Sequence, residues 1–499
     1  MLNKQQQKVV DSTSPKLLCL AGAGTGKTHT MISKIVHYVE DLDVSPSSIL
    51  CLTFTNAAAS EMEARYLSQT TDVGSPYFGT FHKFCYSLII QDEFIRRHLG
   101  YNSVPQVCSE SQERLLCDKA QMLASTKLSR KAQALNYKPK PKERFEYRVF
   151  QKKLDWLLKT EALITFDRLC YRVCELFEQE HPLILQYLSK YRYVFVDEFQ
   201  DTDLLQWKFV KSFLKNSHVC VVGDVRQNLY SFRGSTSDII KQLSKDGGWE
   251  TIKLEQNYRS SIEICDYANH IVKGYQDDID DIELTSDHHG PKLRHAKTQV
   301  FDANIKTVLD DDCESIAIIA RTNREVDHIK NICLQEKIPF TTKLHNNLEG
   351  LIASALNEEF YHSYLLSHLP RDIRTETLRN LYLDPNYDIM PTCLKHRSDI
   401  IEEVEAIRES DNLSEIEQIL DSGGMTLHEI AESSMLQLAT DDVRLYLGTI
   451  HSVKGLEFDS VYVYDVGGKH FKIYNEDMRN LYYVACTRAK SLLTIVSDT

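Results

Sequence analysis

Two adjacent carboxylates follow a short apolar run near the middle of the chain. Residues 194–202 read VFVDEFQDT, so Asp197 and Glu198 come directly after Val194–Val196. A carboxylate at the end of a buried strand is how phosphate-loop nucleotidases hold Mg²⁺, and a second carboxylate beside it can deprotonate an attacking water. An acidic surface turn at the end of a strand would carry the same residues. The pattern therefore acquires a chemical meaning only if the chain also holds a phosphate-binding loop.

Such a loop lies at residues 21–28, which read AGAGTGKT. The stretch matches the P-loop pattern, with alanine in the first glycine position. The small residues leave backbone N–H groups free to approach phosphates, Lys27 would reach the β- and γ-phosphates, and Thr28 would ligate Mg²⁺ beside Asp197. The residues expected to hold ATP are Ala21, Gly22, Ala23, Gly24, Thr25, Gly26, Lys27 and Thr28. Together the two motifs predict hydrolysis of ATP with Mg²⁺, with Glu198 as the general base.

The elements that must position these motifs are short apolar strands with helical stretches between them. Both motifs directly follow such a strand. This βα alternation predicts an α/β fold with parallel sheets and helices on both faces, in which ligands bind at the carboxyl ends of the strands. The predicted strands are KLLCL, SILCLTF, YRYVFVDE, HVCVVGD, SIAIIAR, VRLYLGTI, SVYVYDV and SLLTIVS.

Composition limits the class of protein. The chain has 499 residues, a net charge of −13, no apolar run long enough to span a membrane and no visible signal peptide. Its 13 cysteines include no CxxC pair, so we expect buried reduced thiols in a cytoplasm rather than disulfides or a metal site. The acidic balance argues against a uniformly basic coat for nucleic acid but leaves room for a local basic surface.

One stretch provides such a surface. Residues 127–153 hold ten Lys or Arg against two Glu. Cations interleaved with aromatic rings suit phosphate contact and base stacking, while a solvated helix with a proline-kinked loop is the alternative. The aromatic residues in the stretch are Tyr137, Phe145, Tyr147 and Phe150.

Further motifs occur in a fixed order along the chain. They are LNKQQQKVV (2–10), TFTNAAASEM (53–62), GTFHKFC (79–85), VGDVRQNLYSFRGS (222–235), LEQNYRS (254–260), ARTNRE (320–325), TIHSVKGLEF (449–458) and LYYVACTRAK (481–490). Together with the two motifs above, this ordered set resembles UvrD/Rep-type superfamily-one DNA helicases over nearly the whole chain. The resemblance implies two RecA-like P-loop cores with parallel sheets, each carrying a short, mainly helical insertion.

The resemblance also implies boundaries for these parts. The first core would comprise residues 1–85 and 161–255, with a basic helical insertion at 86–160. The second core would comprise 256–345 and 441–499, with a reduced helical insertion at 346–440.

Roles at the nucleotide are likewise implied by the resemblance. Gln6 would read adenine, Tyr258 would stack on the base and Glu457 would contact the ribose. Gln227 would sense the γ-phosphate and couple it to DNA. Two arginine fingers, Arg259 and Arg488, would come from the second core, since a guanidinium stays charged and meets phosphate oxygens in pairs. ATP would therefore sit between the cores.

The DNA-binding residues follow from the same motifs. Base-stacking positions are Phe54, Tyr230 and Phe232; core packing is the alternative for each of these aromatic rings. Positions expected at the DNA backbone are Thr53, Asn56, Thr80, His82, Thr449 and His451. The resemblance implies 3′→5′ movement on single-stranded DNA, and because stacking tolerates any base sequence, such a protein can step along any strand.

The chain departs from the family pattern at several motif positions. Ala57 stands where the family usually has Lys, Phe232 where Trp is frequent, Val453 for Ala and Asn480 for the second arginine of its motif. None of these changes removes a catalytic group. Both insertions are shorter than in the large repair helicases, which argues against strong autonomous unwinding.

Length and layout are also similar to the helicase-like subunit of the Gabija anti-phage system, whose partner is an ATPase–nuclease subunit. Three functions therefore stay open: a DNA helicase or translocase, a DNA-sensing ATPase that regulates a partner nuclease in a hetero-oligomer, and a compact DNA-repair helicase. The acidic helical stretch at 398–420 favours the second of these. A small-molecule P-loop kinase would not account for TIHSVKGLEF and VACTRAK.

Overall fold

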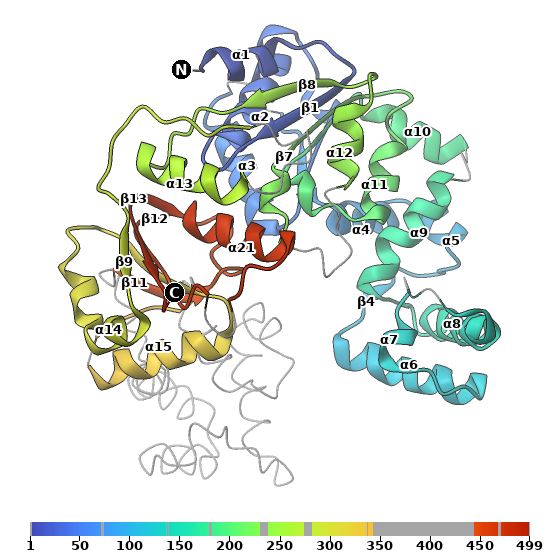
Figure 1. The fold of residues 1–499 in the computed structure, drawn as a ribbon. Helices are drawn as coiled ribbons and strands as arrows, with labels where there is room; N and C mark the ends of the chain where they lie inside the picture. The colour runs from blue at the N-terminus through green and yellow to red at the C-terminus, as the bar shows by residue number, and fades with distance from the viewer. Residues whose placement is uncertain are drawn as a thin grey trace, which may run out of the picture. The chain divides into compact units, whose positions relative to one another are not determined.

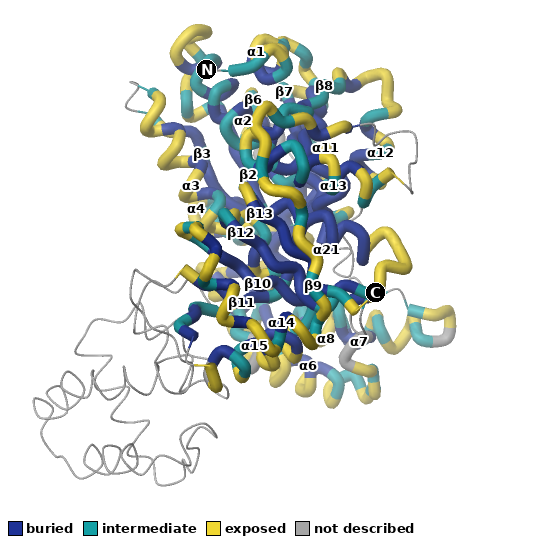
Figure 2. Tube along the Cα trace, turned by 60° about the vertical axis from the view of Figure 1, so that its left-hand side comes forward, coloured by how far each residue is buried: buried dark blue, intermediate teal, exposed yellow. Residues whose placement is uncertain are grey.

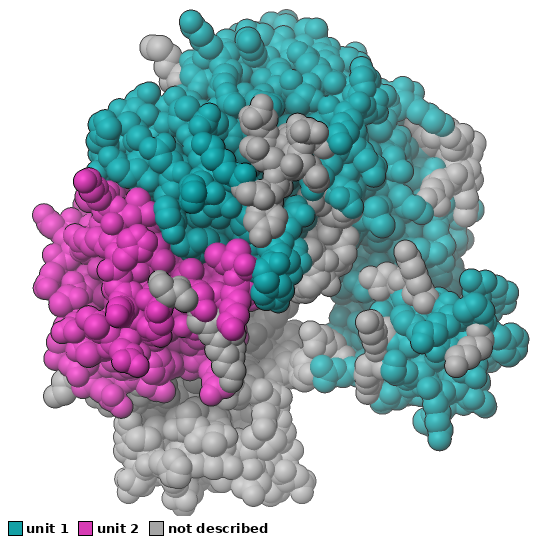
Figure 3. Space-filling model, in the orientation of Figure 1, with its two compact units in different colours: residues 1–290, 474–487 teal, residues 291–473, 488–499 magenta. Residues whose placement is uncertain are grey.

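The computed structural model describes the chain in two compact units. The described residues are 2–70, 74–135, 137, 139–178, 182–229, 238–273, 282–336, 338–342, 444–467 and 471–498. Unit 1 is formed by Met1–Gly290 and Tyr474–Thr487, and unit 2 by Pro291–Ile473 and Arg488–Thr499 (Figure 3). Each unit is built around its own sheet.

The sheet of unit 1 has six strands in the order β3-β2-β6-β7-β1-β8, and every neighbouring pair is parallel (Figure 1). Its strands are β1 (Lys16–Ala21), β2 (Ile49–Thr53), β3 (Tyr77–Thr80), β6 (Tyr193–Val196), β7 (His218–Gly223) and β8 (Glu250–Leu254). Because all strands run the same way, their carboxyl ends meet at one edge of the sheet, where both the phosphate loop and the DEFQD turn begin.

Helices cover both faces of this sheet. In β1, Leu17 and Cys19 enter one apolar core, while Leu18 and Leu20 enter the other, as the alternation of side chains along a strand requires. The inner strands are accordingly buried on both sides, whereas the edge strand β8 is only partly buried (Figure 2). The helices are α1 (Lys4–Asp11), α2 (Lys27–Val36), α3 (Asn56–Leu67), α4 (Phe81–Gln91), α5 (Glu93–His98), α9 (Phe166–Glu178), α10 (Pro182–Lys190), α11 (Leu204–Lys211), α12 (Asp238–Lys245) and α13 (Ile262–Val272).

A helical subdomain interrupts the αβ order of unit 1 between α5 and α9. Its helices are α6 (Glu110–Ala124), α7 (Arg130–Gln133) and α8 (Arg144–Thr160), and the short parallel pair β4 (Gln106–Val107) and β5 (Leu163–Ile164) closes its base. The subdomain has a small core of its own, which includes Leu116, Ala120, Phe150 and Leu158. It can therefore present its outer helix faces without exposing the main core.

Unit 2 is built on a second parallel sheet, in the order β11-β10-β12-β13-β9. Its strands are β9 (Arg294–Ala296), β10 (Ile316–Ala320), β11 (Leu445–Thr449), β12 (Phe458–Val463) and β13 (Ala489–Val496), with helices α14 (Thr298–Ala303) and α15 (Asn323–Gln335). The two parallel sheets confirm the predicted α/β fold class. The predicted insertion at 346–440 lies outside the described residues.

One helix of unit 1 lies, in the sequence, between two strands of unit 2. Helix α21 (Glu476–Cys486) follows β12 and precedes β13 in sequence, but it packs against α13 in unit 1. The hydroxyls of Tyr482 on α21 and Tyr267 on α13 lie 2.6 Å apart. Both helices fall in stretches that the sequence assigns to the second core. In the described part of the chain, no helix combines the length and hydropathy needed to cross a bilayer.

Candidate nucleotide and DNA sites

The phosphate loop joins β1 to α2 in a conformation that needs glycine. Gly24 and Gly26 have φ angles of +69° and +76°, which L-residues rarely adopt. A Cβ on Gly24 would lie 2.7 Å from the Asn257 side chain. The Thr25 hydroxyl donates to the Gly22 carbonyl oxygen at 2.9 Å and closes the loop. The N-terminus of α2 directly follows, and its unpaired N–H groups and dipole favour phosphate.

The structure brings the two predicted halves of the site together. The Thr28 hydroxyl at the start of α2 donates to Asp197 Oδ2 at 3.0 Å. Asp197 lies just beyond β6 and is only 5% exposed. Burial and the neighbouring charge of Glu198 raise the pKa of Asp197 to about 6, although Lys27 and the hydrogen bond from Thr28 lower it. A hydroxyl and a carboxylate thus converge beside a lysine that belongs to the phosphate loop.

Glu198 is held in an unusual backbone conformation. Its φ of +50° is in the left-handed region, which non-glycine residues rarely occupy outside turns and functional sites. The Gln200 amide donates to the Glu198 carboxylate. Gln200 Oε1 in turn accepts from the backbone N–H of Asp224 at 3.0 Å. The predicted general base is therefore oriented by a side chain tied to the end of the next strand, β7.

Gln227 is also positioned from the end of β7. It is buried, and its Nε2 donates to Asp224 Oδ2 at 2.7 Å. The same carboxylate accepts from the Arg226 backbone N–H at 3.0 Å through Oδ1. Asp224 was not predicted from the sequence, although its place directly after a strand, like that of Asp197, was a usable signal.

Gln6 and Tyr258 both contact the phosphate loop. Gln6 is buried on α1, its Nε2 donates to the Thr25 carbonyl oxygen at 3.1 Å, and its Oε1 accepts from the Asn3 N–H at 3.0 Å. Tyr258 donates its backbone N–H to the Gly24 carbonyl oxygen at 2.9 Å, while its side chain is 54% exposed. An exposed ring beside the loop is available to stack on a base. The adenine-reading role of Gln6 stays a prediction.

The Asn257 side chain forms hydrogen bonds that hold the phosphate loop in place. This role was not predicted from the sequence. Its Nδ2 donates to the Ala23 carbonyl oxygen at 2.7 Å. Its Oδ1 accepts from the backbone N–H groups of Arg259 and Ser260, each at 2.7 Å. The side chain is 1% exposed, so these bonds are shielded from water. The one local signal was its position between two predicted residues in LEQNYRS.

Arg259 lies in unit 1, and its role as an arginine finger of the second core stays a prediction. The segment 255–260 continues from β8 beside the phosphate loop, and Arg259 donates from Nη1 to the Thr487 carbonyl oxygen at 3.2 Å. Thr487 directly follows α21. On that helix, the buried Tyr483 hydroxyl accepts from the Ala23 N–H at 3.4 Å.

Arg488 and Glu457 belong to unit 2. Arg488 is 2% exposed and donates from Nη1 to the Leu456 carbonyl oxygen at 3.2 Å. Glu457 is exposed, and its carboxylate lies 3.6 Å from Lys490 Nζ. Their nucleotide roles stay predictions.

Four of the predicted DNA-contact residues follow β2 and β3 at the edge of the unit 1 sheet. Thr53 and Thr80 are partners in the register of the two strands. The Thr53 hydroxyl is buried without a hydrogen-bond partner among the described residues. Thr80 Oγ1 caps α4 by accepting from the Lys83 N–H at 3.1 Å. Phe54 is half-buried, and Asn56 is exposed at the start of α3.

His82 is paired with an aromatic residue that the sequence did not single out. Its ring stacks on Phe166 with 3.8 Å between centroids and 16° between planes. Burial opposes protonation of His82, but a hydrogen bond to Cys170 and the nearby carboxylates of Asp167 and Asp203 raise its pKa above the ordinary value. Phe166 is 55% exposed, so the pair forms an accessible aromatic surface at the first turns of α4 and α9.

The remaining predicted DNA residues are divided between unit 2 and the undescribed part of the chain. Thr449 and His451 follow β11 in unit 2 and are half-buried. Thr449 Oγ1 accepts from the Ser452 N–H at 3.4 Å. Tyr230 and Phe232 lie outside the described residues.

Comparison with known proteins places these sites in a family. Residues 2–102 and 91–247 match the model of the UvrD/REP helicase N-terminal domain. Residues 252–348 and 392–498 match the model of the UvrD-like helicase C-terminal domain. The matches cover both units.

Individual relatives agree with this assignment. The chain is 27% identical to DNA helicase II of Haemophilus influenzae over 94% of this chain and 68% of the relative. It is 36% identical to a probable DNA helicase II homolog of Rickettsia felis over 54% of this chain and 44% of the relative. It is 29% identical to the ATP-dependent DNA helicase PcrA of Staphylococcus aureus over 68% of this chain and 50% of the relative. The chain spans about half the length of most of the curated relatives it matches.

Proposed function

Because the chain belongs to the UvrD/Rep helicase family, we propose that it is a DNA-dependent ATPase that moves along DNA and separates its strands. The observation that carries the proposal is the 3.0 Å contact between Thr28 and Asp197, with Glu198 next in the chain. This contact joins the phosphate loop to the DEFQD turn, and both face the edge of the sheet where ligands of parallel α/β folds bind.

The donor set suits Mg²⁺. A hydroxyl oxygen and a carboxylate oxygen are hard ligands of the kind that Mg²⁺ prefers, and Thr28 and Asp197 supply one each. When bound with ATP, Mg²⁺ would neutralise charge on the β- and γ-phosphate oxygens.

The chain's own residues would perform the remaining tasks. Lys27 and the N–H groups at the start of α2 would hold the phosphates, and Glu198 would accept a proton from the attacking water. Gln227 would sense the γ-phosphate, and Arg259 would supply a guanidinium to the phosphates as an arginine finger. Arg488 of unit 2 would supply a second guanidinium, and Glu457 would contact the ribose.

Single-stranded DNA would bind along the carboxyl edges of the two sheets. In unit 1, the buried and unpartnered hydroxyl of Thr53 supports this placement, because a buried polar atom without a partner favours a ligand. The His82–Phe166 stack offers an aromatic surface beside it. The 3′→5′ direction of movement is what the family resemblance implies, and a cytoplasmic location is what the cysteine usage implies.

The test is ATP hydrolysis by the purified full chain with and without single-stranded DNA. We expect stimulation by DNA, and loss of both basal and stimulated turnover in Lys27→Ala. A wild-type protein whose ATP hydrolysis ignores DNA would contradict the proposal.

The alternative is an ATPase that regulates a partner nuclease and unwinds little, as in a Gabija-type complex. The acidic stretch on which it depends, 398–420, lies outside the described residues. Co-purification with the product of a neighbouring gene, followed by mass measurement, separates the two proposals. A monomer that unwinds forked duplex by itself favours the helicase, of which a compact repair helicase is one form.

A further inference from the structure

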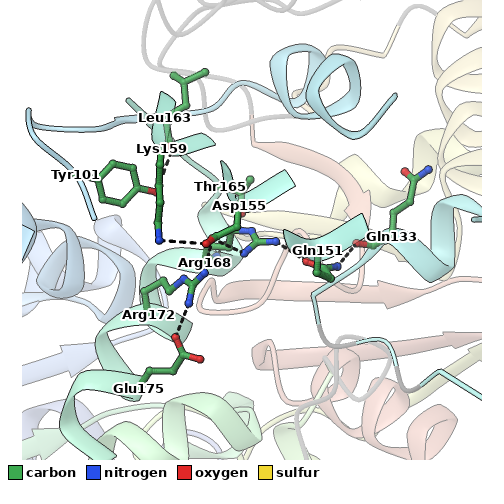
Figure 4. Close-up of polar contacts among 10 residues, drawn as sticks. All are labelled: Tyr101, Gln133, Gln151, Asp155, Lys159, Leu163, Thr165, Arg168, Arg172 and Glu175. Carbon is green, nitrogen blue, oxygen red and sulfur yellow. Dashed lines mark hydrogen bonds and ion pairs between the residues drawn. The ribbon is translucent and has the colours of Figure 1, made fainter. Parts of the chain in front are cut away.

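Helix α8 has two polar sides of different character. On the side that faces α9, Asp155 is surrounded by cations (Figure 4). Its carboxylate lies 3.2 Å from both Lys159 Nζ and Arg168 Nη1, and it also accepts a hydrogen bond from Arg172. Arg168 further donates to Gln151 on α8. These cations are paired with carboxylates, and the contacts join α8 to α9.

The side of α8 next to Asp155 is exposed and carries two large aromatic side chains. Phe145 is 77% exposed and Trp156 is 56% exposed. Their spacing of eleven residues is three helical turns, so both rings project from one face, about 16 Å apart along the axis. Arg148 and Lys152 lie between them on that face and are exposed. We call these four residues the outer face of α8.

Positive charge on this face is not neutralised. Arg144 and Lys153 flank the outer face and are also exposed. Among the described residues, none forms an ion pair with Arg144, Arg148, Lys152 or Lys153. In a chain with a net charge of −13, these four unpaired cations outnumber Glu146, the exposed carboxylate of the same helix, and form a local site for a polyanion.

The structure also separates the aromatic residues of the basic stretch by role. Phe150 is buried in the subdomain core. The Tyr147 hydroxyl donates to the Leu135 carbonyl oxygen at 2.8 Å, and the Tyr137 hydroxyl donates to Glu143 at 2.9 Å. Burial removes Phe150 from the predicted stacking role, whereas Tyr137 and Tyr147 are half-buried and bonded to the subdomain through their hydroxyls. Phe145 is the most exposed of the four rings, and Trp156, outside the predicted stretch, lies on the same face.

We propose that the outer face of α8 is a second binding surface for single-stranded DNA, separate from the strand path at the edges of the sheets. Cations contact phosphates in any nucleic acid, but two flat rings at the ends of a basic strip need unpaired bases to stack on them. An acidic peptide would use the cations and leave both rings without a matching partner. The ligand rests on the proposed function, whereas ATP hydrolysis is not required.

The Asp155 contacts give this surface a fixed position. They hold α8 on α9, and α9 begins at Phe166, whose ring stacks on His82. A strand bound at the outer face is therefore held on the same rigid support as the His82–Phe166 pair.

The experiment measures binding of an unpaired oligonucleotide to the full chain without nucleotide. We expect Phe145→Ala and Trp156→Ala each to weaken binding about fivefold or more, because a stacked base is worth ~1–3 kcal/mol. The matched control is Met122→Ala on α6, which removes an equally exposed apolar side chain, 75% exposed, from the neighbouring helix. It should leave the affinity unchanged.

Tryptophan fluorescence reports the contact directly. The chain has three tryptophans, of which Trp249 is buried and Trp207 is half-buried. Quenching by the oligonucleotide should therefore disappear in Trp156→Phe. Removing two cations with Arg148→Gln and Lys152→Gln should reduce the salt slope of binding by about 1.4.

Each other result overturns the inference. Unchanged affinity in the Phe145→Ala, Trp156→Ala double variant excludes the surface. Equal quenching by blunt duplex excludes base stacking, and quenching only by an acidic peptide assigns the face to a protein. If DNA quenches Trp156 but does not stimulate ATP hydrolysis, the proposed function fails while the surface stands.

Discussion

The edge of the unit 1 sheet and the outer face of α8 differ in how their polar groups are held. At the sheet edge, Thr28, Asp197 and Gln227 already have hydrogen-bond partners within the chain. On the outer face of α8, none of the residues that the structure describes neutralises the exposed cations. A site that must act on reacting atoms needs fixed geometry before the ligand arrives. A surface that accepts any base sequence needs charge and flat rings more than fixed geometry.

The largest expected effect tests the fixed site. Glu198→Gln should lower ATP turnover by about 100-fold or more, because the amide cannot accept the proton from water. Nucleotide binding should persist, since Lys27 and Thr28 are unchanged. Single-turnover hydrolysis and equilibrium binding measure the two effects. Glu63→Gln, an exposed carboxylate on α3, is the control. An active Glu198→Gln protein would remove Glu198 from its assigned role.

The second prediction tests the hydrogen bonds of the Asn257 side chain at the phosphate loop. Asn257→Ala should lower the free energy of unfolding by about 3 kcal/mol, because it leaves three backbone groups without this partner in a buried place. ATP should also bind more weakly. Asn257→Asp keeps the acceptor but places a buried carboxylate oxygen against the Ala23 carbonyl oxygen, so urea unfolding should show that it too is less stable than wild type. Equal stability of all three proteins would show that these hydrogen bonds do not stabilise the fold.

The third prediction compares the two sides of α8. Asp155→Asn should destabilise the protein by about 2 kcal/mol, because Arg168 and Arg172 lose their shared counter-charge in a partly buried place. Burial opposes ionisation of Asp155, but these arginines lower its pKa. Its stabilisation is therefore present above the unfolded pKa and is lost in acid, as pH falls through the folded value. Arg148→Gln on the outer face should leave unfolding unchanged. A similar loss of stability in both variants would contradict the difference between the two sides of α8.

The smallest expected effect is an increase in the free energy of unfolding rather than a decrease. The pKa of Asp197 is raised to about 6 from 3.8, so the folded state holds this proton more tightly than the unfolded state. Stability falls as pH rises from about 4 to about 6, and the cost remains at pH 7. Without Mg²⁺ or nucleotide, Asp197→Asn should therefore raise the free energy of unfolding by about 1–2 kcal/mol at pH 7 and by little near pH 4. Denaturant titrations at both pH values test this, and a destabilised variant at pH 7 would contradict it.

The sequence could predict features that are formed by contiguous residues. The phosphate loop and the DEFQD turn are contiguous motifs that follow strands, and parallel pairing carries both to one edge of the sheet. Contacts between distant segments were not predictable in this way. Tyr483 reaches Ala23 across 460 positions, and α21 returns to unit 1 between two strands of unit 2. No periodicity in a short window encodes such pairings.

The aromatic residues show the same limit. Tyr137, Tyr147 and Phe150 satisfy the basic–aromatic pattern as well as Phe145 does, but burial and hydroxyl partners decide which ring is accessible. Phe166 and Trp156 had no motif to mark them. The exposure of each ring depends on how its helix packs against its neighbours, which a short sequence pattern does not specify.

The path of α21 has a mechanical consequence. The backbone passes between the units after residues 290, 473 and 487, so neither unit is a single uninterrupted piece of chain. A tensile load on β13 would pass through the peptide bond between Thr487 and Arg488 to Tyr483, four residues before Thr487, and from its hydroxyl to the Ala23 N–H. The phosphate loop is thus connected to the start of β13 through one hydrogen bond and a few residues of backbone.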